Sequence, residues 1–120
     1  MKIKTNFTTI PQEFSKGAAE KDVILGNPVR SFPFRIEELP ENTKAIAFSL
    51  IDYDAVPVCS FPWVHWLVTD LDVSDNYVEI PENASAELQD SLIQGKNSFS
   101  TPLLEQDFSE IETLYVGPTY

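Results

Sequence analysis

The sequence of 120 residues is poor in cysteine and histidine, with one of each, Cys59 and His65. A single cysteine cannot form an internal disulfide, so the disulfide framework of small secreted domains is excluded. The N-terminal residues lack the apolar run of a secretory signal, and no stretch approaches the length of a membrane span. We therefore expect a soluble, cytoplasmic protein that is not inserted in a membrane and that folds in a reducing compartment.

Basic residues are also scarce, because 8 Lys and Arg stand against 19 Asp and Glu, a formal net charge of −11. Proteins bind nucleic acids and anionic membranes through Lys and Arg that displace counterions, so this balance argues against both as partners. Apolar residues still make up 42% of the chain, which excludes a disordered acidic segment. The length suits a single domain over residues 1–120 with a buried core.

Alternation of apolar and polar residues predicts a mainly β fold. Apolar residues recur at every second position in three segments, which we predict as strands: residues 30–36, 44–51 and 64–69. In the third segment both faces are apolar, which is typical of a central strand that is covered on both sides.

One segment, from Pro81 to Gln94, carries the signals of a helix. Asn83 or Ser85 can serve as its N-cap, two leucines spaced by four residues follow, and Gly95 is suited to end it. The residues after it, 98–111, mix small polar and acidic side chains and are predicted to form an ordered loop.

Polar side chains cluster between the second and third predicted strands, in the stretch from Asp52 to Trp66. If the second strand continues, a period of two places Asp52 on the same face as the apolar residues before it. A carboxylate in that position is costly to bury unless another group pairs with it. Functional sites are often built where strands end, so this cluster is the first candidate for a site.

The residues of this cluster leave several interpretations open. Asp52, Asp54 and His65 together offer the oxygen and nitrogen ligands of a metal site, which would suit a hydrolase. An Asp-x-Asp pair after a strand is more often a turn whose side chains accept backbone N–H groups. His65, between two tryptophans, is equally well explained as a packed residue. A Cys59–His65 nucleophile is weaker, because no orienting or oxyanion-stabilising groups can be named for it.

Several short motifs stand in a fixed order along the chain: Asp52-Tyr53-Asp54-Ala55, Trp63-Val64-His65-Trp66, Gln94-Gly95-Lys96-Asn97-Ser98 and Tyr115-Val116-Gly117-Pro118. Singly each is unspecific, but as a set they resemble the phosphatidylethanolamine-binding protein family, and most closely its bacterial branch, the Raf-kinase-inhibitor-like proteins. The segment Leu39 to Lys44 also resembles that family, so the likeness runs from about residue 24 to the end.

The resemblance implies an antiparallel β-sandwich with one or two short helices and a shallow pocket for an anionic or phosphorylated ligand, such as a phospholipid head group. Carried over by position, the ligand-binding residues are Asp52, His65, Gly117 and Pro118. Two residues support the pocket: Trp63, and Asp54, which is expected to accept backbone hydrogen bonds. His65 can donate a proton, and Asp52 or the ligand can hold the shared one, so binding is expected to weaken as pH rises.

The function that the resemblance implies is that of a non-enzymatic binding protein, without cofactor or metal, that modulates a kinase or protease. A homodimer is compatible with the sequence. Two alternatives are kept, a metal-dependent hydrolase that uses Asp52, Asp54 and His65, and an acidic interaction protein without a ligand site.

The chain departs from the family pattern at two places. Val56 stands between the alanine and the proline of the family's Asp-Ala-Pro, so the loop there is expected to take a different path. Family members also continue past Gly117-Pro118 into a His-Arg-Tyr-like motif and a further core strand. We therefore expect either a truncated product or a partner that supplies the missing strand, because an unpaired central strand is costly.

Overall fold

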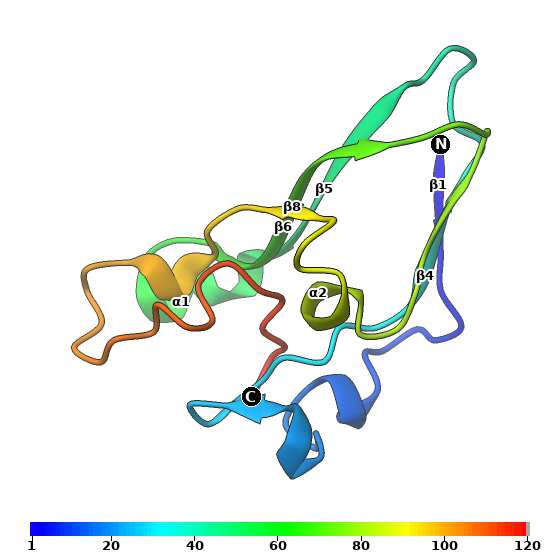
Figure 1. Cartoon of the computed structure of the whole chain (residues 1–120). Helices are drawn as coiled ribbons and strands as arrows, with labels where there is room; N and C mark the ends of the chain where they lie inside the picture. Colours follow the sequence, from blue (N-terminus) through cyan, green and yellow to red (C-terminus); the bar gives the residue numbers. More distant parts are fainter. Residues whose placement is uncertain (120) are drawn as a thin grey trace.

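A computed structural model of the chain, described for residues 1–119, consists of two three-stranded antiparallel sheets and a two-stranded hairpin (Figure 1). The strands in chain order are β1 (Lys2–Lys4), β2 (Val23–Ile24), β3 (Asn27–Pro28), β4 (Phe34–Glu37), β5 (Ala45–Asp52), β6 (Trp63–Asp72), β7 (Val78–Ile80) and β8 (Ile93–Gln94). One sheet has the order β1-β4-β7, the other has the order β5-β6-β8, and β2 pairs with β3. The predicted mainly β, antiparallel fold is confirmed.

Short helical turns connect these strands. They are the 3₁₀ turns η1 (Gln12–Phe14), η2 (Glu20–Asp22), η3 (Tyr53–Ala55) and η4 (Ser98–Ser100), and the α-helical turns α1 (Val56–Cys59) and α2 (Ala84–Glu87). Within residues 1–119, none of the helices has the length and apolar character needed to cross a membrane.

Strand β6 is the centre of its sheet, as its two apolar faces predict. It pairs with β5 along most of its length, from Ala45 opposite Asp72 to Asp52 opposite Trp63, and with the short β8 on its other edge. β8 pairs only with Val68 and Thr69, so it does not reach the start of β6. His65, near that start, is held instead by the C-terminal segment, since its carbonyl accepts the backbone N–H of Val116 at 3.0 Å.

The main core lies between the two sheets and is built largely from aromatic rings. Phe34 of β4 meets Phe48 of β5 edge to face at 5.2 Å between ring centroids, and Trp66 of β6 meets Tyr115 in the same way at 5.6 Å. Such pairs contribute about 0.5–1.5 kcal/mol each beyond the burial of their area. A second apolar cluster packs the C-terminal segment: Val29, Ile111, Leu114 and Val116.

The helix predicted from Pro81 to Gln94 is wrong in its extent, because only Ala84–Glu87 is helical. Asn83 precedes it in a left-handed conformation and makes no side-chain cap hydrogen bond, and Ser85 is buried instead of capping. The segment then turns and its last residues join β6 as β8. Tertiary pairing with a central strand outweighs the weak helical propensity of a segment this short.

The predicted strands also differ from the observed ones at their ends. The first begins only at Phe34, after Pro33, which has no N–H to donate to a neighbouring strand. The second ends at Asp52, and its pairing with β6 shifts register between Leu50 and Ile51. Leu50 lies opposite Trp66 and Ile51 opposite Val64, so the extra residue at this bulge is His65 on β6.

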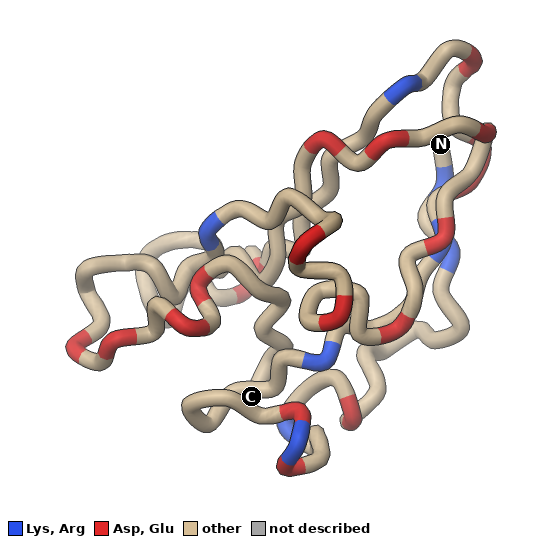
Figure 2. The backbone as a smooth tube through the Cα atoms, in the orientation of Figure 1, with Lys and Arg blue, Asp and Glu red and all other residues tan. Residues whose placement is uncertain are grey.

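Acidic residues are distributed over every part of the backbone, as Figure 2 shows, in keeping with the net charge of −11. Basic residues come together on the β1–β4 pair, where Lys4 lies opposite Arg35. Arg30 bridges two other segments, since its guanidinium contacts Glu82 at 2.6 Å and Asp22 at 3.5 Å. These carboxylates raise the pKa of Arg30, chiefly through the hydrogen bond to Glu82.

Candidate functional site

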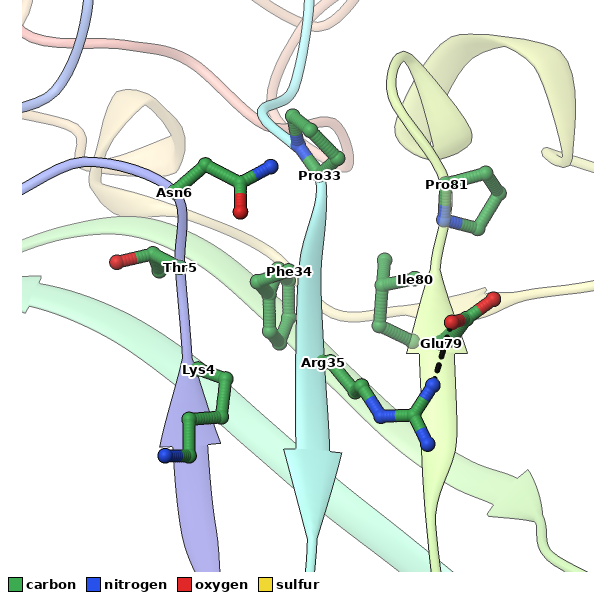
Figure 3. A pocket seen from close by; sticks show the side chains of 9 residues that line it. All are labelled: Lys4, Thr5, Asn6, Pro33, Phe34, Arg35, Glu79, Ile80 and Pro81. Atoms are coloured by element: carbon green, nitrogen blue, oxygen red, sulfur yellow. Dashed lines mark hydrogen bonds and ion pairs between the residues drawn. The ribbon is translucent and has the colours of Figure 1, made fainter.

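The β1-β4-β7 sheet carries a surface cavity of about 510 Å³ that contains none of the residues singled out from the sequence (Figure 3). Two cations line it, Lys4 and Arg35. Arg35 is bound to Glu79, lies 3.3 Å from a carboxylate oxygen of Glu37 and stacks over the ring of Tyr77 at 4.0 Å. Because the guanidinium already has these partners, it is poorly placed to attract a further anion.

A second cavity, of about 520 Å³, lies at the start of β6 and contains most of the predicted site. Its lining residues are Asn27, Asp54, Ala55, Val58, Cys59, Trp63, His65, Phe99, Gly117 and Thr119. The fold thus brings His65 and Gly117 together from positions far apart in the sequence, with Trp63 and Asp54 beside them. Of the predicted site residues that the structure describes, Asp52 and Pro118 are not part of this lining.

His65 is held by the C-terminal segment, and the residue is only 5% exposed. Its Nδ1 lies 2.7 Å from the carbonyl oxygen of Val116, while the backbone N–H of Val116 donates to the carbonyl of His65. Since a carbonyl can only accept, Nδ1 carries the hydrogen and the neutral ring presents a lone pair at Nε2. Within residues 1–119, the buried Nε2 has no hydrogen-bond partner.

Burial is the main influence on the charge of this imidazole. Desolvation lowers the pKa of His65, and the hydrogen bond to Val116 and the negative charge of Asp52 oppose that effect only in part. The ring is therefore neutral at pH 7. The neutral ring therefore carries a hydrogen-bond acceptor, rather than a cation, at Nε2, and His65 is among the residues that line the cavity.

The lowered pKa of His65 predicts a loss of stability in acid. In the unfolded chain the pKa of His65 is about 6.5. The neutral folded ring therefore contributes its full stability above pH 6.5. That stability is lost as pH falls through the lower folded pKa, by at most about 1.4 kcal/mol per pH unit. Denaturant unfolding of the wild type and of His65→Asn between pH 7.5 and 5 measures it. We expect the difference in unfolding free energy between the two proteins to shrink toward pH 5; a constant difference would contradict the assignment.

The two aspartates occupy positions that are the reverse of those expected. Asp52 Oδ1 accepts a hydrogen bond from the backbone N–H of Asp54 at 2.9 Å and so caps η3, which is the role expected of Asp54. The residue that lines the cavity is Asp54. Asp52 still lies close enough for its charge to act on the pKa of His65.

The alternative of a metal centre built from Asp52, Asp54 and His65 is wrong. Within residues 1–119, no three or more His, Cys, Asp or Glu side chains converge in a way that could hold a metal ion. Asp52 uses a carboxylate oxygen on the backbone of the turn, and Nδ1 of His65 is committed to Val116. The three residues are neighbours in this region without forming one ligand set.

Much of the cavity wall is apolar and aromatic. Trp63 stacks on Phe61 at 5.9 Å between ring centroids and meets Phe99 edge to face at 5.2 Å. Cys59 also lines the cavity, and its Sγ lies 3.3 Å from the carbonyl oxygen of Ala55 and 3.2 Å from that of Phe61. A thiol that donates to these carbonyls holds the α1 turn together.

Gly117 forms its part of the wall with backbone alone. Its N–H donates to the carbonyl of Pro28 at 2.9 Å, and a Cβ at this position would lie 2.0 Å from the carbonyl oxygen of Phe14. No side chain fits there, so glycine lets the C-terminal segment approach both the hairpin and the η1 region. Pro118 follows it, partly exposed and outside the lining.

Two residues that support the site were not recognised individually from the sequence. Ser98 accepts a hydrogen bond at Oγ from the backbone N–H of Val64, directly before His65, at 2.7 Å. Asn97 is 2% exposed and donates from Nδ2 to the carbonyls of Ile111 and Leu114, both at 2.8 Å. The motif from Gln94 to Ser98 was the available signal, but taken alone it indicates only a helix end and a turn.

A buried polar network anchors the opposite face of β6. Trp66 Nε1 donates to Gln94 Oε1 at 2.8 Å, and Ser85 Oγ donates to the same oxygen at 2.6 Å. The hydroxyl of Ser85 also accepts the backbone N–H of Tyr115 at 2.7 Å. Through these bonds α2, β8 and the C-terminal segment are tied to the strand that carries His65.

Comparison with known proteins agrees with the resemblance seen in the sequence. The sequence model of the family described as "Phosphatidylethanolamine-binding protein" matches residues 2–119. The chain is also 43% identical over 108 residues to the Bacillus subtilis (strain 168) protein named "Uncharacterized protein YxkA". The match covers 89% of this chain and 62% of that relative, so the chain spans less than two thirds of the length of the relative it matches.

Proposed function

Since this chain belongs to the phosphatidylethanolamine-binding protein family, we propose that it is a non-enzymatic binding protein that holds a small anionic or phosphorylated ligand in the cavity at His65. Family membership supports a binding protein of this kind. The cavity supports the location, because it collects His65, Trp63 and Gly117 from two motifs that are distant in the sequence.

The observation that carries the proposal is the unpartnered Nε2 of His65. A buried acceptor without a hydrogen bond costs about 1–3 kcal/mol, so proteins rarely leave one unless a ligand or an ordered water completes it. The ring is held rigidly by Val116, which orients Nε2 before any ligand arrives. Such preorganisation favours binding because little freedom is left to lose.

The charges around the cavity indicate how an anion would be held. Of the residues that line it, none is Lys or Arg, and Asp54 is among them. An anion is therefore held by hydrogen bonds and by a proton shared with His65 rather than by pairing with a fixed cation. Binding then takes up a proton, so affinity should fall as pH rises through the pKa values of the bound complex.

Replacing His65 by asparagine tests the site. The amide Nδ2 can keep the hydrogen bond to the carbonyl of Val116, while the acceptor at Nε2 is removed. We expect the affinity for phenyl phosphate, measured by calorimetry at pH 6.5, to fall at least roughly tenfold, since one lost hydrogen bond to a charged group is worth about 1.5–3 kcal/mol.

The matched control for this experiment is Glu105→Gln, which changes an exposed carboxylate outside the cavity. It should leave the affinity unchanged. Equal affinity of the wild type and His65→Asn, with both folded by circular dichroism, would remove His65 from the site and with it the proposed function.

A kinase or protease as the regulated partner, and a cytoplasmic location, are further parts of the proposal that family resemblance supports. If a partner is modulated through the cavity, His65→Asn should abolish the modulation. If the acidic surface alone engages a partner, that variant should bind it as the wild type does, which is the outcome the acidic interaction alternative requires.

A further inference from the structure

We propose that the free edge of β5 pairs with the same edge of a second copy of this chain. The two β5-β6-β8 sheets then form one continuous antiparallel sheet across a two-fold axis. Strand β5 has the eight residues Ala45–Asp52, and within residues 1–119 it pairs with β6 alone. Such pairing needs no ligand in the cavity at His65.

The backbone groups at this edge have no backbone partner within residues 1–119. Leu67 lies opposite Ser49, but its carbonyl accepts the N–H of Gly95 on the side away from β5. At the other end of the ladder, the carbonyl of Lys44 accepts the N–H of Val73. N–H and C=O groups alternate in direction along a strand, so every second residue of β5 turns them toward the free edge. These residues are Ala45, Ala47, Ser49 and Ile51.

Strand β5 lacks the features that usually keep an edge strand from pairing, which are lysines, prolines, bulges or a very short length. By contrast, β1 is an edge of the other sheet and has only three residues, two of which are lysines. β5 has no proline and no charged residue before Asp52, and at both of its register shifts the extra residue lies on β6. A long, regular and uncharged edge of this kind is a template for another strand.

One antiparallel register makes this edge complementary to itself. When Phe48 lies opposite Phe48 of the second copy, Ile46 lies opposite Leu50 and Lys44 opposite Asp52. Phe48 and Leu50 pack on the core but are only partly buried, so the pairing covers apolar surface that is now exposed. An aromatic pair then occupies the centre of the interface, with an apolar pair on either side of it.

The charges at the two ends of the interface select this register. Lys44 and Asp52 meet twice, once at each end, in a chain that otherwise carries a net charge of −11. A shift of two residues in either direction would place Asp52 opposite Asn42 or Ile46 instead. A shift by one residue would move the apolar side chains of the two copies to opposite faces of the sheet.

The unpaired backbone groups also meet in this register. Ala47 lies opposite Ser49 and Ala45 opposite Ile51, and each such pair exchanges two hydrogen bonds. The side chains of Ala45, Ala47 and Ser49 are small and exposed, so they do not obstruct a second strand.

Sedimentation equilibrium of the full chain tests the association. The wild type should dimerise reversibly, from the 13.5 kDa monomer to twice that mass as the protein concentration rises. Lys44→Glu places a carboxylate opposite Asp52 at both ends of the interface, so we expect the dimer dissociation constant to rise at least roughly tenfold. A wild type that stays monomeric up to millimolar concentration would overturn the proposal and leave this edge to a strand of a different protein.

Lys16→Glu is the matched control, because Lys16 is exposed and lies between η1 and η2, outside β5. Both variants change the net charge by the same amount, so the general repulsion between two acidic chains is the same in each. Lys16→Glu should therefore dimerise more tightly than Lys44→Glu. Equal dissociation constants for the two variants would contradict the pairing of Lys44 with Asp52.

Cysteine cross-linking tests the register itself. Ala47→Cys and Ser49→Cys proteins, mixed, allowed to exchange and then oxidised, should form a disulfide with each other, because directly opposite residues of a hydrogen-bonded pair have Cα atoms about 5.5 Å apart. Each variant alone should give no more cross-linked dimer than the wild type, in which Cys59 sets the background. Strong cross-linking of either variant alone would place that residue opposite itself and overturn the register.

Discussion

Replacing Asn97 by aspartate is expected to lower the free energy of unfolding by at least about 3 kcal/mol at pH 7, which is among the largest effects that the structure predicts. Asn97 is 2% exposed, and its side-chain amide donates to two carbonyls, those of Ile111 and Leu114. A carboxylate has the same shape but no donor, so it leaves the carbonyl of Leu114 without its hydrogen bond at about 1–3 kcal/mol. It also removes one of the two hydrogen bonds of the Ile111 carbonyl, which keeps the N–H of Leu114 at 3.1 Å, and it buries a charge beside both carbonyls.

The hydrogen bond that the side-chain oxygen of Asn97 accepts would be unchanged in this variant. Asn97 Oδ1 accepts the backbone N–H of Phe99 at 2.9 Å, and an aspartate keeps that bond. The loss therefore comes from the two missing donors and the added charge, not from a cavity or from the broken cap of η4. The substitution should also disturb the ligand site, because Ser98, in the same turn, accepts the N–H of Val64 at Oγ beside His65.

The pH dependence of Asn97→Asp gives this prediction a signature. Burial against two carbonyls should raise the pKa of the new carboxyl above its unfolded value of about 3.9. A group with a raised folded pKa contributes stability below the unfolded pKa and loses it as pH rises through the folded one. The deficit relative to the wild type should therefore be small near pH 4 and grow toward pH 7 in denaturant titrations.

Asn76→Asp is the matched control, because it makes the same chemical change at an exposed side chain. It should change stability by less than about 0.5 kcal/mol, as is usual for surface substitutions. Equal losses in the two variants, or a deficit in Asn97→Asp that does not vary with pH, would contradict the role assigned to Asn97.

Gly117→Ala is expected to cost about 3 kcal/mol or more of stability and to abolish ligand binding. The added Cβ would lie 2.0 Å from the carbonyl oxygen of Phe14 and 2.9 Å from the hydroxyl of Tyr115, which itself donates to that carbonyl at 2.7 Å. The first of these contacts is with backbone, so relief requires the C-terminal segment to move away from η1. That movement would also displace the Val116 carbonyl that holds His65.

The cost at Gly117 is steric, whereas alanine at a second glycine, Gly26, would cost only backbone conformational energy. Gly26 has a φ of +78°, and no atom lies within 4 Å of the place that a Cβ would occupy, so Gly26→Ala carries only the cost of a left-handed backbone, about 1–2 kcal/mol. Thermal unfolding of both variants, with calorimetry of phenyl phosphate binding, separates the two causes. If Gly117→Ala were no more destabilising than Gly26→Ala, and still bound ligand, the close approach would be refuted.

The strands could be predicted from the sequence because their signal is local. The period of two is set by the geometry of a single strand, and β5 and β6 were both located to within a few residues. The central position of β6 also followed, since a strand with two apolar faces must be covered on both. The helix from Pro81 failed because its residues pair and hydrogen-bond with partners elsewhere, such as Gln94 with Trp66.

The positions of the two aspartates show where local reasoning about the site ends. Residue type alone does not say which of Asp52 and Asp54 caps the turn and which faces the cavity. The folded chain settles it, because Asp52 accepts the backbone N–H of Asp54 and Asp54 lines the cavity. Sequence proximity had also suggested a joint metal site, which the same local geometry does not form.

By itself, the sequence determined the fold class, the family and a small set of candidate site residues, because periodicity and motif order are properties of the chain. Only the tertiary structure decided which hydrogen-bonding groups of those residues are paired and which are free. The carbonyl of Val116, 51 residues from His65, sets the ring's tautomer and leaves Nε2 as a buried acceptor. That outcome depends on two distant segments meeting with their hydrogen-bonding groups in register, which no local pattern specifies.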